Sequence, residues 1–390
     1  MVNGSSSVII ISNDIVPGFS MPVAAPGLRA FGLAEGLRAH GLRVKTLIGK
    51  ELLNRQWGWR GPSIPPPTPV DVDVIEPQLF SQYLERHAPA TVILINSNQI
   101  NYLERIDGIR YILDFFAPKM LELAYQGGEV YPIEDIKRLR QQKLRAIDLA
   151  DGFIINGKKK VPYFLAWLLQ SDRDIRQLPF AVVPMGVPQN WVDTSIKDKG
   201  AVRLAITGYL HRWDAPGEWV GTLERLLSKN LNFHLDLLLP FHWGNDPYRQ
   251  GFTNEFERLA SYPAVTSHSP MPFSNFQRFL STVDVVIDLF AHNLEREYAM
   301  VTRSVVALAC GVPVMHPPFT EVSPFIAQYD AGWLLDADNT CQIQETLEAI
   351  INDPQLVQQK AKNARKLAQE VFDPAIAARP LLRLIEHPTP

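Results

Sequence analysis

The sequence is poor in cysteine and has no long apolar run. Only Cys310 and Cys341 occur among its 390 residues, which supports neither a disulfide framework nor a cluster of thiolate metal ligands. No segment reaches the ~18 consecutive apolar residues of a membrane-spanning helix. The N-terminus also lacks the basic start and apolar stretch of a signal peptide. We therefore expect a cytoplasmic protein.

Motifs for several kinds of chemistry are also absent. The net charge is −3, and no basic run is longer than Lys158, Lys159 and Lys160, so nucleic acid is not an expected partner. That triplet is expected to be the solvated start of a helix. The histidines share no metal-ligand spacing, and neither a G-x-S-x-G nor a Walker A motif occurs. We expect no bound metal, no cofactor and no serine-hydrolase chemistry.

What the sequence does contain is a repeated alternation of strand and helix signals. Hydrophobic residues make up 46% of the chain, and its length suits two domains of ~150–200 residues. A β-branched run predicts a buried strand at residues 8–11, followed by a loop at residues 17–27. Apolar periodicity predicts a helix at residues 28–40, ended by Gly41. With another strand at residues 44–48, this opening is a Rossmann-type unit.

The same pattern continues in two consecutive arrays. Further strands are expected at residues 91–95, 111–113, 152–155, 181–183, 202–206, 233–239, 283–289 and 313–315. Further helices are expected at residues 134–149, 161–169, 219–227, 275–280, 302–309, 340–352 and 357–371. The sequence therefore predicts an α/β protein with two doubly wound lobes. Residues 1–188 would form the first lobe, residues 189–370 the second, and residues 371–390 a helical tail that could pack back on the first.

Polar residues and glycines follow the strands of the first lobe, at the edge where open α/β sheets bind ligands. They are Asn13, Asp14, Gly18, Asn96, Asp114 and Asn156. In the loop before the first helix, Gly18 and Gly27 would let a phosphate or an acceptor approach backbone N–H groups near Arg29. A tight turn without a ligand explains these glycines equally well.

The loop at residues 208–214 is the richest polar cluster after a strand of the second lobe. A glycine permits close approach of a ligand, and arginine and histidine suit an anionic diphosphate. A surface loop with a half-buried Trp213 is the alternative, and we favour a binding site. The candidate residues of this region are Gly208, Tyr209, His211, Arg212 and Asp214, with His242 and Asn245 after the next strand.

Residues 295–304 form a third candidate segment. Thr302 or Ser304 could begin the helix and leave its free N–H groups pointing at a phosphate. Arg303 could add a bidentate contact to that phosphate, while Glu295 and Glu297 could accept hydrogen bonds from hydroxyl groups. In the alternative interpretation, Arg303 and Glu295 only pair with each other at the edge of the helix.

Several of these segments together resemble a known family. Residues 295–314, which include Arg303 and end in ALACGVPV, resemble the donor-site segment of GT-B glycosyltransferases of the family-4 type. Residues 325–335 are similar to the closing strand of that family. Residues 11–14 with residues 25–30 are similar to the first βα unit of a bacterial branch. The segments at residues 111–122, 150–153 and 208–214 follow in the matching order.

The resemblance implies a GT-B fold, in which two Rossmann-like lobes face each other across a cleft. It also implies transfer of a sugar from a nucleotide-activated donor to an acceptor hydroxyl, without a divalent metal and with retention at the anomeric carbon. The second lobe would hold the nucleotide and the first the acceptor. Contact with a membrane surface stays open, because the acceptor could be lipid-linked.

The resemblance also assigns roles to the candidate residues. In place of a metal, arginine and N–H groups would stabilise the departing diphosphate. The candidate catalytic residues are Asp114, as acceptor contact or proton acceptor, and Arg212, Glu295 and Arg303. The candidate donor-binding residues are Gly208, Tyr209, His211, Asp214, Thr302 and Ser304.

The sequence departs from the family pattern at both donor motifs. The family has two glutamates eight residues apart, where this chain has Tyr298 and Val306. Glu295 and Arg303 have the same spacing three positions upstream. In the loop after the first strand of the second lobe, Tyr209 replaces the expected arginine.

At the position of the expected lysine in that loop stands Asp214, which leaves Arg212 and His211 as substitutes. Two other functions therefore stay open. One is a nucleotide-sugar 2-epimerase of the same fold, in which carboxylates and histidine would abstract protons. The other is a non-catalytic GT-B-like subunit that binds a sugar nucleotide or a partner enzyme.

Overall fold

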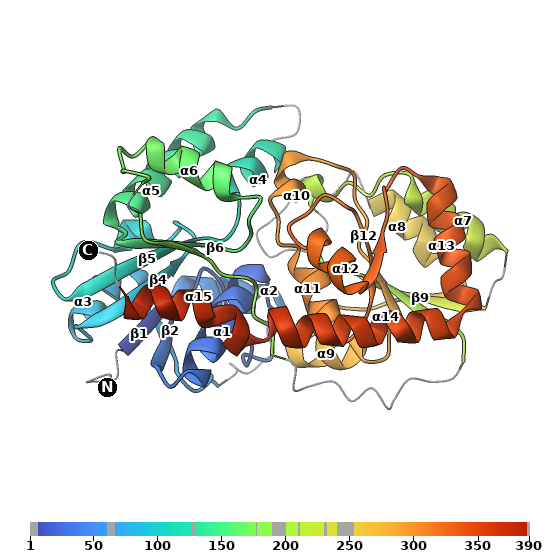
Figure 1. Ribbon diagram of the computed structural model, residues 1–390, viewed down its shortest axis with the longest axis horizontal. Helices are drawn as coiled ribbons and strands as arrows, with labels where there is room; N and C mark the ends of the chain where they lie inside the picture. Colours follow the sequence, from blue (N-terminus) through green and yellow to red (C-terminus); the bar gives the residue numbers. More distant parts are fainter. Residues whose placement is uncertain are drawn as a thin grey trace. The chain divides into compact units, whose positions relative to one another are not determined.

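The computed structural model describes residues 7–60, 67–126, 130–176, 178–188, 200–209, 211–229, 232–239 and 253–387. These residues form two compact units (Figure 1). The first unit consists of residues 1–123, 132–188 and 371–390, and the second of residues 124–131 and 189–370. Residues 189–199, at the start of the expected second lobe, lie outside the described residues.

The first unit is built on a seven-stranded sheet in which all described strand pairs are parallel. The strand order is β3-β2-β1-β4-β5-β6-β7, so the chain reverses direction across the sheet between β1 and β4. Ile11 at the end of β1 is paired with Leu47 on one side and Leu94 on the other. The strands are β1 (Ser7–Ile11), β2 (Arg43–Gly49), β3 (Val72–Ile75), β4 (Ala90–Ile95), β5 (Ile109–Phe115), β6 (Gly152–Ile155) and β7 (Phe180–Val182).

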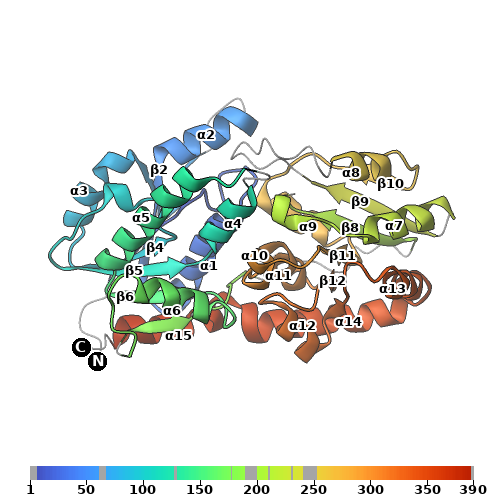
Figure 2. The same cartoon turned by 90° about the horizontal axis from the view of Figure 1, so that it is seen from above.

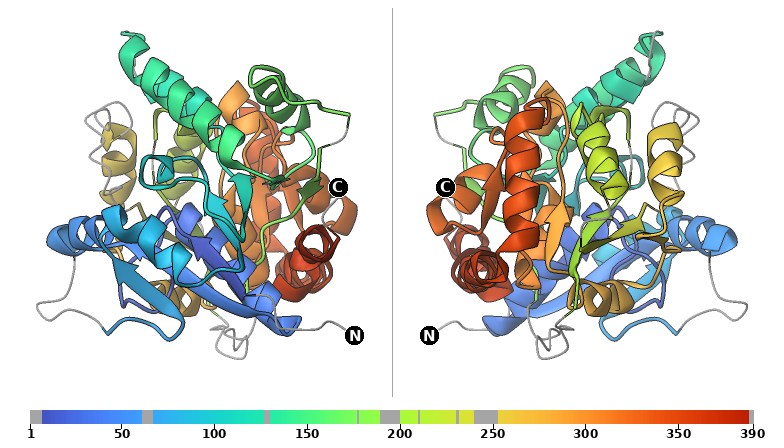
Figure 3. Two further views of the ribbon diagram at one scale, coloured as in Figure 1. Left: turned by 90° about the vertical axis from the view of Figure 1, so that its left-hand side faces the viewer. Right: turned by 90° about the vertical axis from the view of Figure 1, so that its right-hand side faces the viewer.

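Helices cover both faces of this sheet, as the left panel of Figure 3 shows. Alternate residues of the strands, such as Ile9 and Val92, share one core with α3, α5 and α6. The intervening residues, such as Ile10 and Ile93, are also buried, and α1 lies against strands β1, β2 and β4. The helices are α1 (Ala25–Ala39), α2 (Lys50–Arg60), α3 (Phe80–Glu85), α4 (Lys119–Gln126), α5 (Ile133–Leu149), α6 (Val161–Leu169) and α15 (Pro374–Glu386), with 3-10 turns η1 (Pro77–Leu79) and η2 (Ile100–Tyr102).

The C-terminal helix α15 packs on α1 within the first unit (Figure 1). Gly36 of α1 allows this close approach, and Gly32 allows that of the backbone at Gly186. A Cβ atom at Gly32 would lie 2.0 Å from the carbonyl oxygen of Gly186, and one at Gly36 would lie 2.2 Å from that of Pro374. Because van der Waals contact needs more than 3 Å, only glycine fits at these positions.

The second unit repeats the architecture with six parallel strands. Their order is β10-β9-β8-β11-β12-β13, with the reversal between β8 and β11. Figure 2 shows this sheet from above and the right panel of Figure 3 from the side. The strands are β8 (Val202–Thr207), β9 (Phe233–Leu238), β10 (Val265–Ser267), β11 (Val285–Ile287), β12 (Val314–His316) and β13 (Gly332–Leu334).

One core of the second unit joins the strands to α7, α8 and α13, and on the other side α11 and α12 pack against α14. In the described residues, no helix has both the length and the apolar character needed to cross a bilayer. The helices are η4 (Arg212–Asp214), α7 (Trp219–Ser228), α8 (Thr253–Ala260), α9 (Phe273–Leu280), α10 (Leu294–Glu297), α11 (Thr302–Ala309), α12 (Ser323–Tyr329), α13 (Thr340–Asn352), α14 (Pro354–Leu367) and the π-helix η6 (Ala368–Phe372).

Three expected boundaries were wrong in ways that bear on the site. Helix α1 begins at Ala25, three residues earlier than expected, so Gly27 belongs to the helix and not to the loop before it. Strand β11 ends at Ile287, so Asp288 follows the strand. The last expected helix of the second lobe divides into α14 and the π-helix η6. His242 and Asn245 lie outside the described residues.

Candidate functional site

The site is built where the sheet of the second unit reverses direction. In open parallel sheets, the carboxyl ends of the two strands at this reversal leave a crevice in which ligands bind. Here those strands are β8 and β11. Gly208 follows β8 and Asp288 follows β11. The candidate loop at residues 208–214 and the candidate helix α11 both meet this edge.

Gly208 packs directly against the side chain of Arg303. Its φ of +101° lies in a region that favours glycine, and a Cβ atom there would lie 2.7 Å from Cδ of Arg303. Any larger residue would push the arginine away. The glycine is therefore needed to bring the loop after β8 onto α11.

Arg303 links three parts of the second unit. Its Nε donates to Asp288, its Nη1 donates to the carbonyl of Tyr209 at 3.1 Å, and its Nη2 donates to Asp214 at 3.2 Å. The charges of Asp214 and Asp288 outweigh the effect of burial and raise the pKa of Arg303. Because its side chain keeps 17% of its surface exposed, Arg303 is tied into the structure and still open to a ligand.

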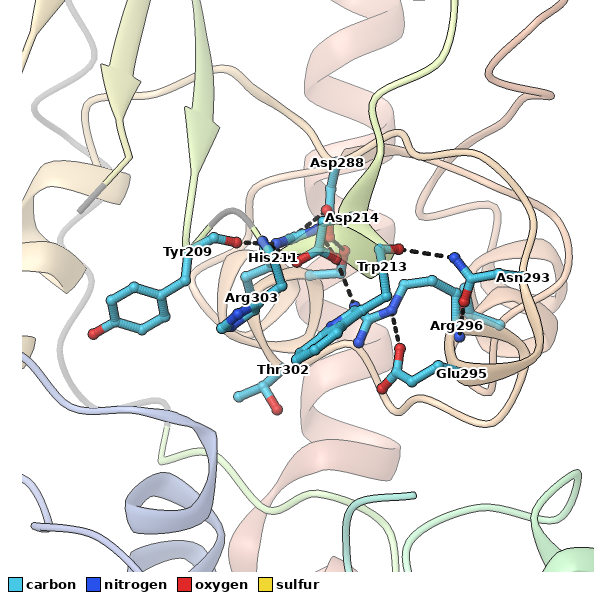
Figure 4. Close-up of polar contacts among 12 residues, drawn as sticks. Tyr209, His211, Trp213, Asp214, Asp288, Asn293, Glu295, Arg296, Thr302 and Arg303 are labelled. Atoms are coloured by element: carbon cyan, nitrogen blue, oxygen red, sulfur yellow. Dashed lines mark hydrogen bonds and ion pairs between the residues drawn. The ribbon is translucent and has the colours of Figure 1, made fainter. Parts of the chain in front are cut away.

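Asp214 is shared between two arginines (Figure 4). Its Oδ1 accepts hydrogen bonds from Nη1 of Arg296 at 2.9 Å and from Nη2 of Arg303. Arg296 also donates to Glu295. Burial opposes ionisation of Asp214, but the charges of Arg303 and Arg296 outweigh it and lower the pKa of this carboxyl group. The alternative in which Glu295 and Arg303 pair with each other is wrong, because each is tied to a different partner.

An aromatic ring supports both arginines from one side. The guanidinium carbons of Arg296 and Arg303 lie 5.5 and 5.6 Å from the centroid of the Phe290 ring, within the range of cation–π attraction. Phe290 is fully buried, and its ring meets that of His316 edge to face. The two cations are thus held between an aromatic platform and carboxylates.

The start of α11 differs from the expectation. Val301 is the N-cap residue, and no side chain caps the helix. Thr302 donates a long hydrogen bond of 3.4 Å to the carbonyl of Met300. Ser304 is fully buried and donates to Asp288. Its hydroxyl therefore supports the carboxylate and is not displayed at the helix start.

The remaining residues of the loop after β8 contribute in different ways. Asp214 accepts a hydrogen bond from the backbone N–H of His211 at 3.2 Å, which closes the turn η4. The imidazole of His211 stacks on the indole of Trp213, with ring centroids 4.4 Å apart. The side chain of Tyr209 points away from the ion pairs in Figure 4. The side chain of Arg212 lies outside what the structure describes.

The candidate residues of the first unit are distributed differently. Asp114 accepts a hydrogen bond from Nε of Arg29 at 2.8 Å, and both side chains are fully buried. Desolvation raises the pKa of Asp114, although the charge of Arg29 opposes this shift. A Cβ atom at Gly27 would lie 1.7 Å from the carbonyl oxygen of Ile15. Gly27 therefore lets the first turn of α1 pack on the preceding loop.

Gly18 lies in a turn with a φ of +112°, where a Cβ atom would come within 2.7 Å of the Pro69 ring. The basic triplet also departs from expectation. Lys160 is fully buried and donates to the carbonyl of Phe116 and to Asn156. A solvated helix start was therefore the wrong interpretation for this lysine, because its ammonium is bonded to residues that follow strands β5 and β6.

Sequence reasoning missed four residues of this cluster, namely Asp288, Phe290, Arg296 and His316. A signal existed for Asp288, because a lone carboxylate inside an otherwise apolar expected strand needs a buried partner. Arg296 lay inside a candidate segment but was not selected. Phe290 and His316 gave no signal, because their roles depend on neighbours that are distant in sequence.

Similar architectures occur among solved structures. A sucrose-phosphate synthase from Thermosynechococcus elongatus matches over 98% of both chains, with a TM-score of 0.67 and 13% identity. An alpha-glucosyltransferase in complex with UDP-glucose and DNA containing an abasic site matches over 98% of this chain and 100% of its own, with a TM-score of 0.68 and 10% identity. HepE of Anabaena in complex with UDP and glucose matches over 98% and 99%, with a TM-score of 0.64 and 14% identity.

These likenesses extend over both units and both sheets. This chain has the GT-B fold. At 10–14% identity the likeness concerns the fold. No protein-family model matches the sequence, and no curated protein matches it either. Any functional assignment must therefore come from the site.

Proposed function

We propose that this protein is a glycosyltransferase that moves a sugar from a nucleotide-activated donor to an acceptor hydroxyl. The observation that carries the proposal is the Arg296–Asp214–Arg303 cluster, which lies at the reversal point of the second sheet in a GT-B fold. Neighbours of this fold hold UDP or UDP-glucose. The second unit is accordingly proposed as the donor unit and the first as the acceptor unit.

The chemistry needs positive charge beside the leaving group. The bond between the anomeric carbon and the diphosphate oxygen breaks, a new bond to the acceptor oxygen forms, and the acceptor hydroxyl releases its proton. The departing nucleotide thereby gains negative charge, which fixed N–H donors stabilise best in a site closed to water. Arginine suits this task because its planar group can bind a phosphate with two parallel hydrogen bonds.

Arg303 is the residue best placed for that contact. Three of its N–H groups are committed to Asp288, Tyr209 and Asp214, and guanidinium has five. The remaining two are available to the diphosphate, together with the uncapped start of α11. The internal contacts fix the direction of the group before a ligand arrives, which lowers the cost of reorganisation.

The proposal keeps the metal-independent, retaining mechanism. In the described part of the chain, no group of three or more His, Cys, Asp or Glu side chains is arranged to hold a metal ion. Asp114 remains the proposed acceptor-side residue, but it is fully buried and does not touch the acceptor itself. Its burial and its pairing with Arg29 mean that it would act by orienting the acceptor side rather than by taking a proton directly. Transfer in the presence of EDTA, with a product of unchanged anomeric configuration, is the expected result.

The deciding experiment is a thermal-shift screen of nucleotides and nucleotide sugars, followed by product analysis with the ligands that bind. We expect one nucleotide sugar to raise the melting temperature, since binding to the folded state stabilises it by mass action. An epimerised sugar formed without acceptor would favour the 2-epimerase. Binding without hydrolysis or transfer would favour the non-catalytic subunit.

Substitution of Arg303 tests the proposed site. We expect Arg303→Ala to lower turnover by about 100-fold or more, as is typical when one donor to developing charge is lost. Arg258→Ala is the matched control, because Arg258 is an exposed arginine of α8 in the same unit. Wild-type turnover in a folded Arg303→Ala variant would exclude this site.

A further inference from the structure

A chain of buried hydrogen bonds runs behind the arginine cluster of the second unit. Ser304 donates to Oδ2 of Asp288 and lies 3.0 Å from Nδ1 of His316. Nε2 of His316 lies 2.8 Å from the hydroxyl of Thr320, which lies 2.9 Å from that of Ser323. The four residues from Ser304 to Ser323 are at most 1% exposed. Water therefore cannot substitute for any link.

Counting protons fixes the direction of this chain. Asp288 is paired with Arg303, so its carboxylate accepts and Ser304 must donate. The single hydrogen of the Ser304 hydroxyl is then used in the bond to Asp288. Nδ1 of His316 must therefore carry a hydrogen and donate it to the oxygen of Ser304. Burial lowers the pKa of His316 to about 4, which leaves the ring neutral, and its Nε2 then accepts from Thr320. Ser304, His316 and Thr320 therefore each donate toward Asp288, whereas Ser323 donates to the carbonyl of Pro317.

The chain fixes both oxygens of one carboxylate. Oδ1 of Asp288 accepts from Nε of Arg303, and Oδ2 accepts from Ser304. A carboxylate held at one oxygen can turn about its own axis, whereas one held at both cannot. The segment from Pro317 to Ser323, which follows β12, is tied to the same chain because Ser323 donates to the carbonyl of Pro317 at 2.7 Å.

We propose that His316 is a positioning residue for the sugar transfer: acting through Ser304, it fixes the carboxylate of Asp288 and thereby the direction of the Arg303 guanidinium. This inference rests on the proposed function, because it assigns a task to Arg303 in turnover. His316 itself touches no ligand. Loss of the link should therefore affect the oriented transition-state contact more than nucleotide binding, and kcat should fall more than KM rises.

Two substitutions of His316 separate the two ring nitrogens. An asparagine amide can place its N–H where Nδ1 lies and still donate to Ser304. A glutamine amide reaches the Nε2 position and leaves Ser304 without its donor. We expect His316→Gln to lower kcat by about tenfold, the loss expected for one displaced hydrogen bond. We expect His316→Asn to stay within about threefold of wild type, because the link to Ser304 survives.

Ser304→Ala interrupts the same chain one step nearer to Asp288, and its kcat should fall at least as far as that of His316→Gln. Ser281→Ala is the matched control, because Ser281 is also a buried serine of the second unit but donates to the carbonyl of Arg278. Thermal melting of all four variants tells a loss of fold from a loss of positioning. The asparagine variant keeps the test meaningful if the glutamine variant is unstable.

The tautomer of His316 gives a readout that needs no ligand. Nitrogen NMR of the free protein should show the ring of His316 neutral at pH 7, with hydrogen on Nδ1. Hydrogen on Nε2 would overturn the inference, and so would equal kcat values for the glutamine, asparagine and wild-type proteins. A wild-type protein that transfers no sugar would refute the proposed function and the positioning role together. An active wild type with an unaffected glutamine variant would refute the positioning role alone.

Discussion

The two units place buried charges at the carboxyl edges of their sheets in different ways. In the first unit, Arg29 and Asp114 form a pair that is completely buried. In the second unit, Asp214 joins Arg296 and Arg303, and Arg303 continues to Asp288. The first unit holds a single ion pair near the charge of the buried Lys160, whereas the second unit links several ion pairs in series.

This difference distinguishes charges that serve the structure alone from charges that can also bind a ligand. An isolated buried pair must stay together, because either partner alone would be an uncompensated charge in a medium of low polarity. In a connected network, a partly exposed group can bind a ligand through its remaining N–H groups while its internal contacts stay in place. The partial exposure of Arg303, at 17%, fits the second case, whereas neither member of the Arg29–Asp114 pair is exposed.

The largest expected effect comes from breaking the isolated pair. Arg29→Met leaves Asp114 buried without its cation, and we expect the free energy of unfolding to fall by about 3–5 kcal/mol. The double variant Arg29→Met with Asp114→Leu should recover most of the loss, because no charge is then left in the core. Urea denaturation measures both.

The same change in the network should cost less. Because Arg296 also pairs with the buried Glu295, the test uses Arg296→Met together with Glu295→Gln. Asp214 then stays paired with Arg303, so we expect a loss of about 1–3 kcal/mol, nearer to that of one charged hydrogen bond. Equal losses for the Arg29 and Arg296 variants would erase the distinction between the two units.

The next effect concerns acid stability. Burial lowers the pKa of His316 from 6.5 to about 4. Between these two pH values, His316 is protonated in the unfolded chain and neutral in the folded protein. The stability contribution is complete above pH 6.5 and is lost as the pH falls toward 4, by roughly 3 kcal/mol. Unfolding experiments from pH 7 to pH 4 should show this loss in the wild type and a shallower one in His316→Asn. Parallel curves would contradict it.

The last effect is a gain in stability. Lys143 lies in the first unit with its ammonium 4.5 Å from the Phe115 ring centroid and 5.3 Å from that of Trp167. Burial lowers its pKa from 10.5 to about 7. Above pH 10.5 the lysine is neutral in both states and does not destabilise the fold, and it destabilises the fold increasingly as the pH falls toward 7. We expect Lys143→Met to stabilise the protein at pH 7 by about 1–3 kcal/mol, since an apolar side chain of similar length avoids the desolvation.

The comparison between variant and wild type should be repeated at pH 9.5. There the advantage of Lys143→Met should shrink, because removing the proton from the unfolded wild-type lysine costs less free energy as the pH approaches 10.5. A constant difference at both pH values would show that the aromatic rings, rather than the charge, decide the energy of this site.

Much of the fold could be predicted from the sequence. The buried strands β1, β4 and β6 were expected within one residue at each end, because short apolar runs rich in β-branched residues and bounded by polar residues are typical of strands covered on both faces. Short elements such as β3, β10 and α8 were missed. They lie at sheet edges or carry few apolar residues, so their hydrophobic periodicity is weak.

Part of the candidate site could also be predicted. Gly208, Asp214, Glu295 and Arg303 were selected because they follow strands or lie next to a helix start, and the structure gathers them around one edge of the second sheet. Their assigned roles in transfer stay predictions. The ion pairs among them could not be foreseen, because spacing along the chain does not say which carboxylate an arginine will reach.

The sequence by itself determined the order of strands and helices, and with it two parallel sheets whose loops meet at known edges. Hydrophobic periodicity is a local property, so it can be recognised in a short segment without knowing how the rest of the chain folds. Only the tertiary structure decided that Arg29 is sealed in the first unit while Arg303 is shared and partly exposed in the second. That outcome depends on long-range packing, since the burial of a charge and the identity of its partner are set here by groups 85 and 89 residues away in sequence.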